Sequence, residues 1–324
     1  MILVINTICH NEEATLDELF RRMPKKISGV DKIIKMLVDD GSSDDTVKIA
    51  ERNGAVVIEN HSQKKLAYSF QAAIDKALEL GADFFVNIDG DLQFRPEEIT
   101  NVVKPVVDGV ADFAAGDRFT DPKTGKNIKP LDMPASKYFG NLVGAMIVSK
   151  MSGQKFNDVT CGFRAFNRKA LLSININSKL TYTQETFQTL ASKKLNIVQV
   201  PITVKYYPGR KSRVVTSILG YITGSAFNIL KTFRDYSPLS FFGTMGFVSF
   251  LISLVLLGFT GVHWVRTGGF SPYKFVGFAG IYFISLAIVI WLFGLLADMF
   301  DRLINNQDKI LYNLKAIRYK KSKD

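Results

Sequence analysis

Two carboxylates lie two positions apart in the stretch NIDGDLQFRPEEI, residues 87–99. Asp89 and Asp91 follow the apolar run 84–86 and therefore stand at the end of a predicted buried strand. Like charges at the edge of a core repel each other and cost desolvation free energy unless a cation lies between them. With the side chain of Gln93 they offer the hard oxygen ligands that Mg²⁺ or Mn²⁺ prefers. The loop does not fit an EF-hand, because its sixth position is not glycine.

The chemistry of such a metal site implies a phosphate ligand. A divalent ion held by one or two carboxylates usually completes its shell with substrate phosphates and water. The inferred ligand is therefore a diphosphate, such as that of a nucleotide sugar. The alternative is a polar turn, since Asp-x-Asp is frequent by chance, and the position of the motif after a predicted fourth strand favours the metal.

The first 116 residues or so alternate between strand-like and helix-like segments. The strand-like runs are ILVINTI, KIIKMLVD, AVVIEN, DFFVNID and ADFAAG, and helices are expected to begin near Ala14, Asp44, Lys65 and Pro96. This alternation predicts βαβ units and a mostly parallel sheet, in which ligands bind beyond the carboxyl ends of the strands. Three acidic clusters fall at those ends: HNEE (10–13), VDDGSSDDT (38–46) and DGD (89–91). Three clusters at one edge indicate a binding site.

The rest of the polar part carries a surplus of positive charge. Residues 117–135 form a polar loop over the predicted site, followed by a helix (136–151), the turn NDVTCGFRAF, a helix near 183–194 and the strand NIVQVPITVKYY. The loop PGRKSR (208–213) is densely basic, and the chain holds 41 Lys+Arg against 30 Asp+Glu, a formal charge of +11. This charge suits an anionic partner. The alternative for the loop is a plain surface or headgroup-binding segment.

Two apolar runs near the C-terminus, 239–262 and 275–297, are 24 and 23 residues long. About 20 apolar residues cross a bilayer core of roughly 30 Å as a helix, so we predict a transmembrane hairpin; the alternative is two buried helices of a soluble protein. Segment 214–235 is amphipathic and predicts an interfacial helix, or alternatively a core-packing one.

Charge asymmetry predicts the orientation of this hairpin. Seven Lys/Arg follow the second run, whereas the linker between the runs holds only Arg266 and Lys274. The positive-inside rule then places the N-terminal part and the tail in the cytoplasm. We expect no signal peptide, because Met1 leads directly into a strand-like run. The isolated Cys9 and Cys161 predict buried thiols.

Six segments, in order along the whole chain, carry a resemblance to a known family. They are INTICHNEEATL, VDDGSSDDT, DGDLQFRPEEI, AAGDRF, DVTCGFRAFNR and QVPITVKYYPGRKSR. The chain resembles family 2 glycosyltransferases of the GT-A fold, specifically the polyprenyl-phosphate glycosyltransferases related to dolichol-phosphate mannose synthase. Bacterial undecaprenyl-phosphate glucosyltransferases with two C-terminal transmembrane helices are similar throughout.

The resemblance implies an α/β, Rossmann-like GT-A catalytic domain over residues 1–211. It further implies amphipathic interfacial helices over 212–236, the hairpin over 237–298 and a basic cytoplasmic tail over 299–324. The protein is then expected to be an integral protein of the cytoplasmic membrane. A homo-oligomer, with a tetramer as one form, is implied by the two-helix relatives.

The resemblance also implies roles for individual residues. Nucleotide-sugar binding is expected of Thr7, Asn11, Glu12, Asp39, Asp40, Lys64, Asp89 and Gln93, and metal binding of Asp89, Asp91 and Gln93. Acceptor-phosphate binding is expected of Arg118, Ser136, Lys137, Arg210, Lys211 and Arg213. Catalytic roles are expected of Asp89, Asp91, Asp158 and Glu185, with Asp158 as a base or an orienting residue and Glu185 near the acceptor.

The sequence departs from the family pattern in four places. The opening loop lacks a proline, and NHSQKKLAYSF replaces a glycine-rich loop, so that Lys64 and Lys65 are candidates for phosphate contact. Tyr206 or Tyr207 stands where an arginine is expected. Gly90 replaces a common alanine, which we expect to be a mild change.

The expected reaction transfers a sugar from a UDP-glucose-like or GDP-mannose-like donor to undecaprenyl or dolichyl phosphate. The phosphate monoester is already ionised at pH 7, so it needs no strong general base, and a single displacement inverts the anomeric centre. The alternatives are a donor carrying a modified pentose or aminosugar and a non-catalytic, membrane-anchored binder or scaffold. A processive synthase is disfavoured because no Q-x-x-R-W motif is present, and a nucleic-acid partner is not expected.

Overall fold

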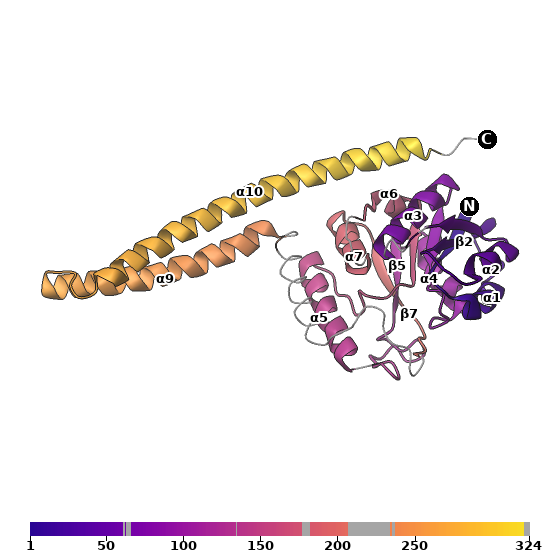
Figure 1. The fold of residues 1–324 in the computed structure, drawn as a ribbon, viewed down its shortest axis with the longest axis horizontal. Helices are drawn as coiled ribbons and strands as arrows, with labels where there is room; N and C mark the ends of the chain where they lie inside the picture. The colour runs from indigo at the N-terminus through magenta and orange to yellow at the C-terminus, as the bar shows by residue number, and fades with distance from the viewer. Residues whose placement is uncertain are drawn as a thin grey trace. The chain divides into compact units, whose positions relative to one another are not determined.

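The computed structural model describes residues 1–60, 62, 66–133, 135–176, 182–206, 234 and 237–320, with the backbone alone at 135, 136 and 151. Their contacts divide them into two units, and Figure 1 labels most of their helices and some of their strands. The first unit holds all the strands together with the end of the last helix from Tyr312. The second holds the two long apolar helices as far as Leu311.

The sheet of the described residues has seven strands in the order β3-β2-β1-β4-β6-β5-β7. Their bounds are β1 (Ile2–Cys9), β2 (Lys32–Asp39), β3 (Val56–Glu59), β4 (Phe84–Asn87), β5 (Phe113–Asp117), β6 (Arg164–Asn167) and β7 (Ile197–Pro201). Neighbouring strands are parallel except β6, which is antiparallel to both β4 and β5. The mostly parallel α/β sheet predicted from the sequence is therefore confirmed.

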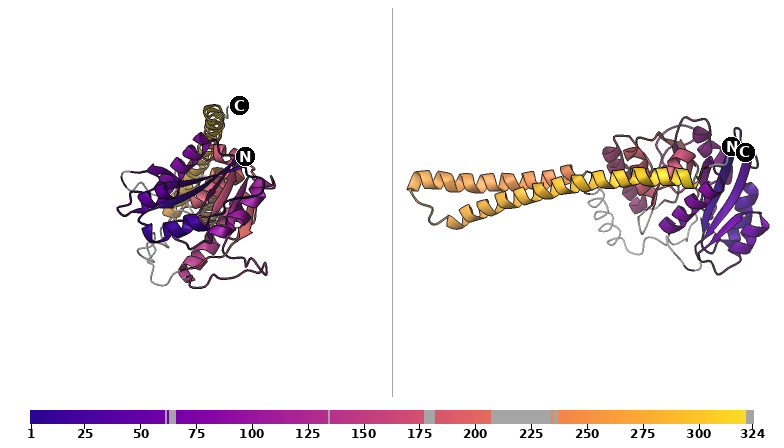
Figure 2. Two further views of the ribbon diagram at one scale, coloured as in Figure 1. Left: turned by 90° about the vertical axis from the view of Figure 1, so that its right-hand side faces the viewer. Right: turned by 90° about the horizontal axis from the view of Figure 1, so that it is seen from above.

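Helices cover both faces of this sheet (Figure 2). One face carries α1 (Glu13–Arg22), α2 (Thr46–Arg52) and α4 (Ile99–Val107), the last preceded by the 3₁₀ turn η1 (Pro96–Glu98). The other face carries α3 (Leu66–Glu79), α5 (Ala135–Ser152), α6 (Arg168–Ser173) and α7 (Thr183–Ser192). The alternation along β1 explains the two layers, because Val4 packs under the second set and Leu3 and Ile5 under the first.

Two elements differ from the sequence prediction. The segment NDVTCGFRAF was expected to be a turn, but its end forms β6 between β4 and β5. The short helix α6 follows at once, and its N-cap Asn167 accepts a hydrogen bond from the backbone N–H of Ala170 at 2.8 Å. A four-residue strand that begins with arginine gives no period-two apolar signal, which is why the sequence did not reveal it.

The second unit contains α9 (Pro238–Thr267) and α10 (Lys274–Arg318), each long and apolar enough to cross a membrane. Small residues at seven-residue spacing are buried where these helices meet: Gly246, Ser253 and Thr260 on α9, and Gly280, Ala287 and Gly294 on α10. The side chain of Ser253 donates a hydrogen bond to the carbonyl of Gly280 at 2.8 Å. Small residues and hydroxyl groups at a helix pair are typical of packing in lipid.

The last turns of α10 belong to the first unit. The Nζ atom of Lys315 donates a hydrogen bond to the carbonyl of Ile174 at 2.8 Å, and Tyr312, Ala316 and Tyr319 pack on the core beneath α3 and α6. The predicted basic tail is thus helical as far as Arg318. Apart from residue 234, the predicted interfacial helices over 212–236 lie outside the described residues.

Candidate functional site

The three acidic clusters come together because β2, β1 and β4 are neighbours in the sheet. Each cluster follows the carboxyl end of its strand, and hydrogen bonds join the loops. The backbone N–H of Glu12 donates to the hydroxyl of Thr46 at 2.9 Å, and the hydroxyl of Thr15 donates to the carbonyl of Gly90 at 2.8 Å. Hydrogen bonds therefore connect the three loops at the sheet edge predicted from the sequence.

The carboxylate pair Asp89 and Asp91 lies half-buried at this edge. Burial and the charge of Asp91 raise the pKa of Asp89 to about 7. Nearby cations lower this pKa, but by less than burial and Asp91 raise it. Gly162 makes room for this carboxylate, since a Cβ atom there would lie 2.8 Å from an Asp89 oxygen. The side-chain amide of Asn87 holds Gly162 in place by donating to its carbonyl at 3.1 Å.

This pair fits a divalent cation. The negative charges of the two carboxylates repel each other, and a cation bound in place of the proton removes this repulsion. Carboxylate oxygens are also the ligands that Mg²⁺ and Mn²⁺ prefer. Asp91 is oriented by the backbone N–H of Gln93, which donates to its Oδ1 atom at 3.0 Å. The site thus offers oxygen ligands and leaves the remaining coordination positions to a substrate.

Gly90, between the two carboxylates, packs tightly against β1. A Cβ atom at this position would lie 2.4 Å from the Sγ atom of Cys9, closer than unbonded atoms approach. The fully packed Cys9 therefore requires glycine at position 90. Contrary to the sequence-based expectation, replacing this glycine by alanine is not a mild change in this chain.

A buried ion pair lies beside the carboxylates. Arg118, directly after β5, donates from Nε to Oδ2 of Asp158 at 2.6 Å and from Nη2 to Oδ1 at 2.9 Å. Arg118 is 6 % exposed and Asp158 fully buried. Burial alone raises the pKa of Asp158, but the guanidinium and its hydrogen bonds outweigh this and lower it. The carboxylate of Asp158 is thus committed to Arg118, which suits an orienting residue better than a base.

Two further contacts fix the guanidinium. Its Nη2 atom also donates to the hydroxyl of Thr160 at 2.7 Å, and Nη1 donates to the hydroxyl of Tyr206 at 3.2 Å. Four of the five N–H groups of Arg118 are used in this way. One N–H on Nη1 is left without a partner in the part of the chain that the structure describes.

Lys137, in the first turn of α5, interacts electrostatically both with this ion pair and with the metal candidates. Its Nζ atom is 5.1 Å from the centre of the Tyr206 ring. Burial and the charge of Arg118 lower the pKa of Lys137, while Asp158 and both carboxylates of the pair act in the opposite direction. Arg118 and Lys137, predicted to bind the acceptor, therefore interact electrostatically with the predicted metal ligands, from which about 30 to 50 positions separate them in the sequence.

Arg164 is a residue of the site that the sequence reasoning did not single out. It is fully buried, and its guanidinium donates to three backbone carbonyls, those of Cys161, Val159 and Thr183. Three aromatic rings surround it: Phe113, Tyr182 and Phe187. Its charge acts on Asp89, whose pKa it lowers against the larger effect of burial. The sequence signal that could have identified Arg164 is an arginine within the apolar run GFRAF.

The predicted nucleoside residues shape the loops after β1 and β2. Asp39 accepts hydrogen bonds from the backbone N–H groups of Gly41 and Ser42, and Asp40 accepts one from the hydroxyl of Ser69 at 2.9 Å. The side-chain oxygen of Asn11 accepts from the backbone N–H of Ser43 at 2.8 Å. The contact between Asn11 and Ser43 joins the loop after β1 to the loop after β2.

The other predicted residues are placed as follows. Thr7 is buried on β1, and Glu185 lies half-buried in the first turn of α7. Lys64, Lys65, Tyr207, Arg210, Lys211 and Arg213 lie outside the described residues, as does the side chain of Ser136. Their roles remain predictions.

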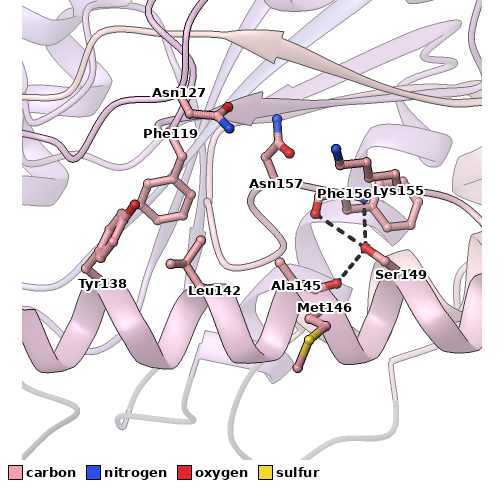
Figure 3. Close-up of a pocket in the computed structure, with 10 residues that line it drawn as sticks. All are labelled: Phe119, Asn127, Tyr138, Leu142, Ala145, Met146, Ser149, Lys155, Phe156 and Asn157. Carbon is pink, nitrogen blue, oxygen red and sulfur yellow. Dashed lines mark hydrogen bonds between the residues drawn. The ribbon is translucent and has the colours of Figure 1, made fainter.

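A cavity of about 290 Å³ lies along α5 (Figure 3). Its walls are mostly apolar, from Phe119, Tyr138, Leu142, Ala145, Met146 and Phe156, with Asn127, Ser149, Lys155 and Asn157 among the polar lining residues. In Figure 3 the rings of Phe119 and Tyr138 lie together at one end. Phe119 and Tyr138 directly follow Arg118 and Lys137, the two residues that we call the basic cluster, and Asn157 directly precedes Asp158, so the cavity adjoins these residues.

Known proteins resemble the chain in sequence and in fold. It is 30 % identical over 232 residues, 65 % of the chain and 89 % of the relative, to the UDP-N-acetylglucosamine–dolichyl-phosphate N-acetylglucosaminyltransferase of Methanococcus voltae. It is 26 % identical over 92 % of the chain and 87 % of the relative to the undecaprenyl-phosphate 4-deoxy-4-formamido-L-arabinose transferase of Sodalis glossinidius.

A solved structure with a similar fold is glucosyl-3-phosphoglycerate synthase of Mycobacterium tuberculosis, in complex with Mn²⁺, UDP and glucosyl-3-phosphoglycerate. The TM-score is 0.50 at 17 % identity, with 72 % of this chain and 78 % of that chain covered. The sequence profile of glycosyl transferase family 2 matches residues 5–174, which contain the carboxylate pair and the Arg118–Asp158 ion pair. Because that match extends over more than half of the chain, this protein belongs to glycosyl transferase family 2.

Proposed function

We propose that this glycosyltransferase moves a sugar from a nucleotide diphosphate sugar to a polyprenyl phosphate at a membrane. The observation that carries the proposal is that the carboxylate pair Asp89 and Asp91 shares one electrostatic environment with Arg118 and Lys137. Such a site accommodates a cation-bound diphosphate beside a second phosphate. The relatives act, by their names, on dolichyl and undecaprenyl phosphates, which supports a lipid acceptor.

The donor end of the site is assigned to the carboxylates. Asp89 and Asp91, with Gln93 beside them, would hold Mg²⁺ or Mn²⁺, in keeping with the Mn²⁺ and UDP complex of the similarly folded synthase. A bound divalent cation supplies electrostatic stabilisation of the leaving nucleoside diphosphate. The loops after β1 and β2, with Asn11 and Asp39, are assigned to the nucleoside. The identity of the sugar is left to experiment.

The acceptor end is assigned to the basic cluster. Arg118 directs its remaining N–H, and Lys137 its ammonium group, to the phosphate of the acceptor. Asp158 orients Arg118 and takes no part as a base, because both of its oxygens accept from the guanidinium. Glu185 and Ser136 are assigned to the surroundings of the acceptor.

The chain's own contribution to the chemistry is positioning. An oxygen of the phosphate monoester attacks the anomeric carbon, the bond to the nucleoside diphosphate breaks, and the anomeric centre is inverted. Since the nucleophile is ionised at pH 7, no side chain has to remove a proton. Holding two reactants in the correct geometry can supply about 7–11 kcal/mol of the barrier reduction, and the fixed guanidinium of Arg118 is suited to this task.

A lipid chain explains two further features. The cavity along α5 begins at the basic cluster and is lined mainly by apolar side chains, so we assign it to the first isoprene units of the acceptor. The helices α9 and α10 have the length and composition to keep the protein in the membrane from which the lipid comes. We assign the first unit and both termini to the cytoplasmic side. A homo-oligomer stays a prediction, to be tested by light scattering of the detergent-solubilised protein.

A direct experiment combines the purified protein with a series of nucleotide sugars and with undecaprenyl or dolichyl phosphate, and identifies the lipid product by mass. We expect one lipid-linked monosaccharide with the wild-type protein and none with Asp91→Ala, which should unfold at the same temperature as the wild type. Asp108→Ala, which removes a surface carboxylate paired with Lys104, is the matched control and should be fully active. Normal turnover by Asp91→Ala would refute the assignment of the carboxylate pair.

A further inference from the structure

Asn141 of α5 is a buried polar residue with an unused hydrogen-bond donor. The residue is 4 % exposed, and its Oδ1 atom accepts from the hydroxyl of Thr160 at 2.8 Å. Its Nδ2 atom is fully buried and has no hydrogen-bond partner among the described residues. Buried amide groups nearly always have a partner, because leaving one unpaired forfeits its hydrogen bonds to water.

The neighbouring hydrogen bonds agree with the orientation of the amide in the structure. The guanidinium of Arg118 can only donate, so the hydroxyl oxygen of Thr160 is the acceptor of the 2.7 Å contact with Nη2. The hydroxyl of Thr160 has one proton and two acceptors within reach. The contact with Oδ1 of Asn141, at 2.8 Å, is shorter than the contact with Oδ1 of Asp158, at 3.3 Å. This contact places the carbonyl oxygen of Asn141 toward Thr160, and the NH₂ group is the part of the amide that has no partner among the described residues.

The position of Asn141 indicates what would complete its hydrogen bonding. It lies one helical turn after Lys137, so the two side chains share a face of α5, and Thr160 links it to Arg118. Both cations belong to the cluster assigned to the acceptor phosphate. An anionic oxygen bound there would lie beside an amide donor that has no other partner in the described part of the chain.

From this we infer that Asn141 is an acceptor-binding residue, whose Nδ2 atom donates a hydrogen bond to a phosphate oxygen of the polyprenyl phosphate. The inference rests on the proposed function, because it names a further contact of the same acceptor site. It also gives Thr160 a role, since this hydroxyl transmits the orientation of Arg118 to the amide. Arg118, Thr160 and Asn141 form one chain of hydrogen bonds, from the guanidinium to the hydroxyl and from the hydroxyl to the amide oxygen.

The test measures binding of the acceptor without turnover. Farnesyl phosphate is titrated into the full-length protein in detergent, in the absence of nucleotide sugar, and farnesol serves as the probe without phosphate. Loss of a hydrogen bond to a charged group predicts that Asn141→Ala weakens farnesyl phosphate binding by about 10- to 100-fold. The affinity for farnesol and for the nucleoside diphosphate should stay unchanged.

Two variants separate this role from a structural one. Asn141→Asp keeps the shape of the side chain and puts a carboxylate next to the phosphate, so binding should weaken more than in Asn141→Ala. Asn167→Ala is the matched control, because both amide atoms of Asn167 are hydrogen-bonded within the protein. It should lower the unfolding temperature and leave farnesyl phosphate affinity unchanged.

The inference is overturned if Asn141→Ala binds farnesyl phosphate as the wild type does, or if only its KM for the nucleotide sugar rises, which would assign the amide to the donor. A lower unfolding temperature with unchanged affinity would also overturn it. Failure of the wild-type protein to transfer sugar to any polyprenyl phosphate would refute the proposed function instead, and binding of farnesyl phosphate is measured independently of that outcome.

Discussion

Gly90→Ala tests whether the position between the two carboxylates is as crowded as the structure shows. The new Cβ atom would lie 2.4 Å from the Sγ atom of Cys9, more than 1 Å inside the distance at which unbonded atoms attract each other. Adding a methyl group to a packed core typically costs about 1–3 kcal/mol. For a domain of this size, each kcal/mol lowers the unfolding temperature by about 2–4 °C, so the expected fall is about 2–12 °C.

The same substitution should impair catalysis, because relief of the clash displaces Asp89 or Asp91. A misplacement of about 1 Å can reduce the rate on the order of 100-fold. Cys9→Ala removes the clashing sulfur, and the next contacts of the new methyl group, 3.4 Å to Thr7 Oγ1 and 3.7 Å to Glu12, are ordinary. The double variant should therefore recover stability and activity relative to Gly90→Ala.

Thermal unfolding and sugar-transfer assays of the two single variants and the double variant form a double-mutant cycle. We expect a coupling of about 1–3 kcal/mol between the two positions. Cys161→Ala, which removes the other buried thiol, is the matched control and should not rescue Gly90→Ala. A coupling of zero, or equal rescue by both cysteine variants, would refute the packing argument.

Three more predictions follow from the site. Because the pKa of Asp89 is raised to about 7 in the folded protein, the metal-free protein should lose stability as pH rises from about 4 to 7. Mn²⁺ affinity, measured by titration, should rise over the upper part of that pH range and level off above it. An affinity that does not change with pH would contradict this prediction. Arg118→Ala should destabilise the protein by about 3–5 kcal/mol in chemical denaturation, since it leaves Asp158 buried and unpaired, and Arg118→Met with Asp158→Leu should recover most of the loss. Leu142→Trp should fill part of the cavity and weaken binding of polyprenyl phosphate but not of nucleotide. Equal effects on both ligands would refute the assignment of the cavity to the lipid.

The sequence predicted the elements that have a strong pattern of their own. Five parallel strands and the helices between them appear where alternating apolar runs and helix start signals placed them, and Pro96 does begin a helical turn. The family, the enzyme class and the mostly parallel α/β fold are confirmed. Parallel strands bring their carboxyl ends to one edge, so the meeting of the three acidic loops also followed from the pattern.

What the sequence did not reveal depends on contacts between distant segments. The strand β6 is held by β4 and β5 on either side, and its four residues show no period of their own. The pairing of Arg118 with Asp158 joins residues forty positions apart, whose roles predicted from the sequence are separate. The steric conflict between Cys9 and position 90 is likewise a property of three-dimensional packing, invisible in a motif where alanine and glycine seem interchangeable.

The anchoring of Arg118 by Asp158, Thr160 and Tyr206 bears on product release. Arginine usually loses about 2 kcal/mol of rotamer entropy when it is immobilised, and here that loss occurs on folding rather than when the lipid binds. In the proposed reaction a phosphate monoester with nearly two negative charges becomes a diester with one. A rigid cation that offers a single N–H therefore attracts the substrate more strongly than the product. The site would favour the arriving lipid over the departing one, which would limit product inhibition.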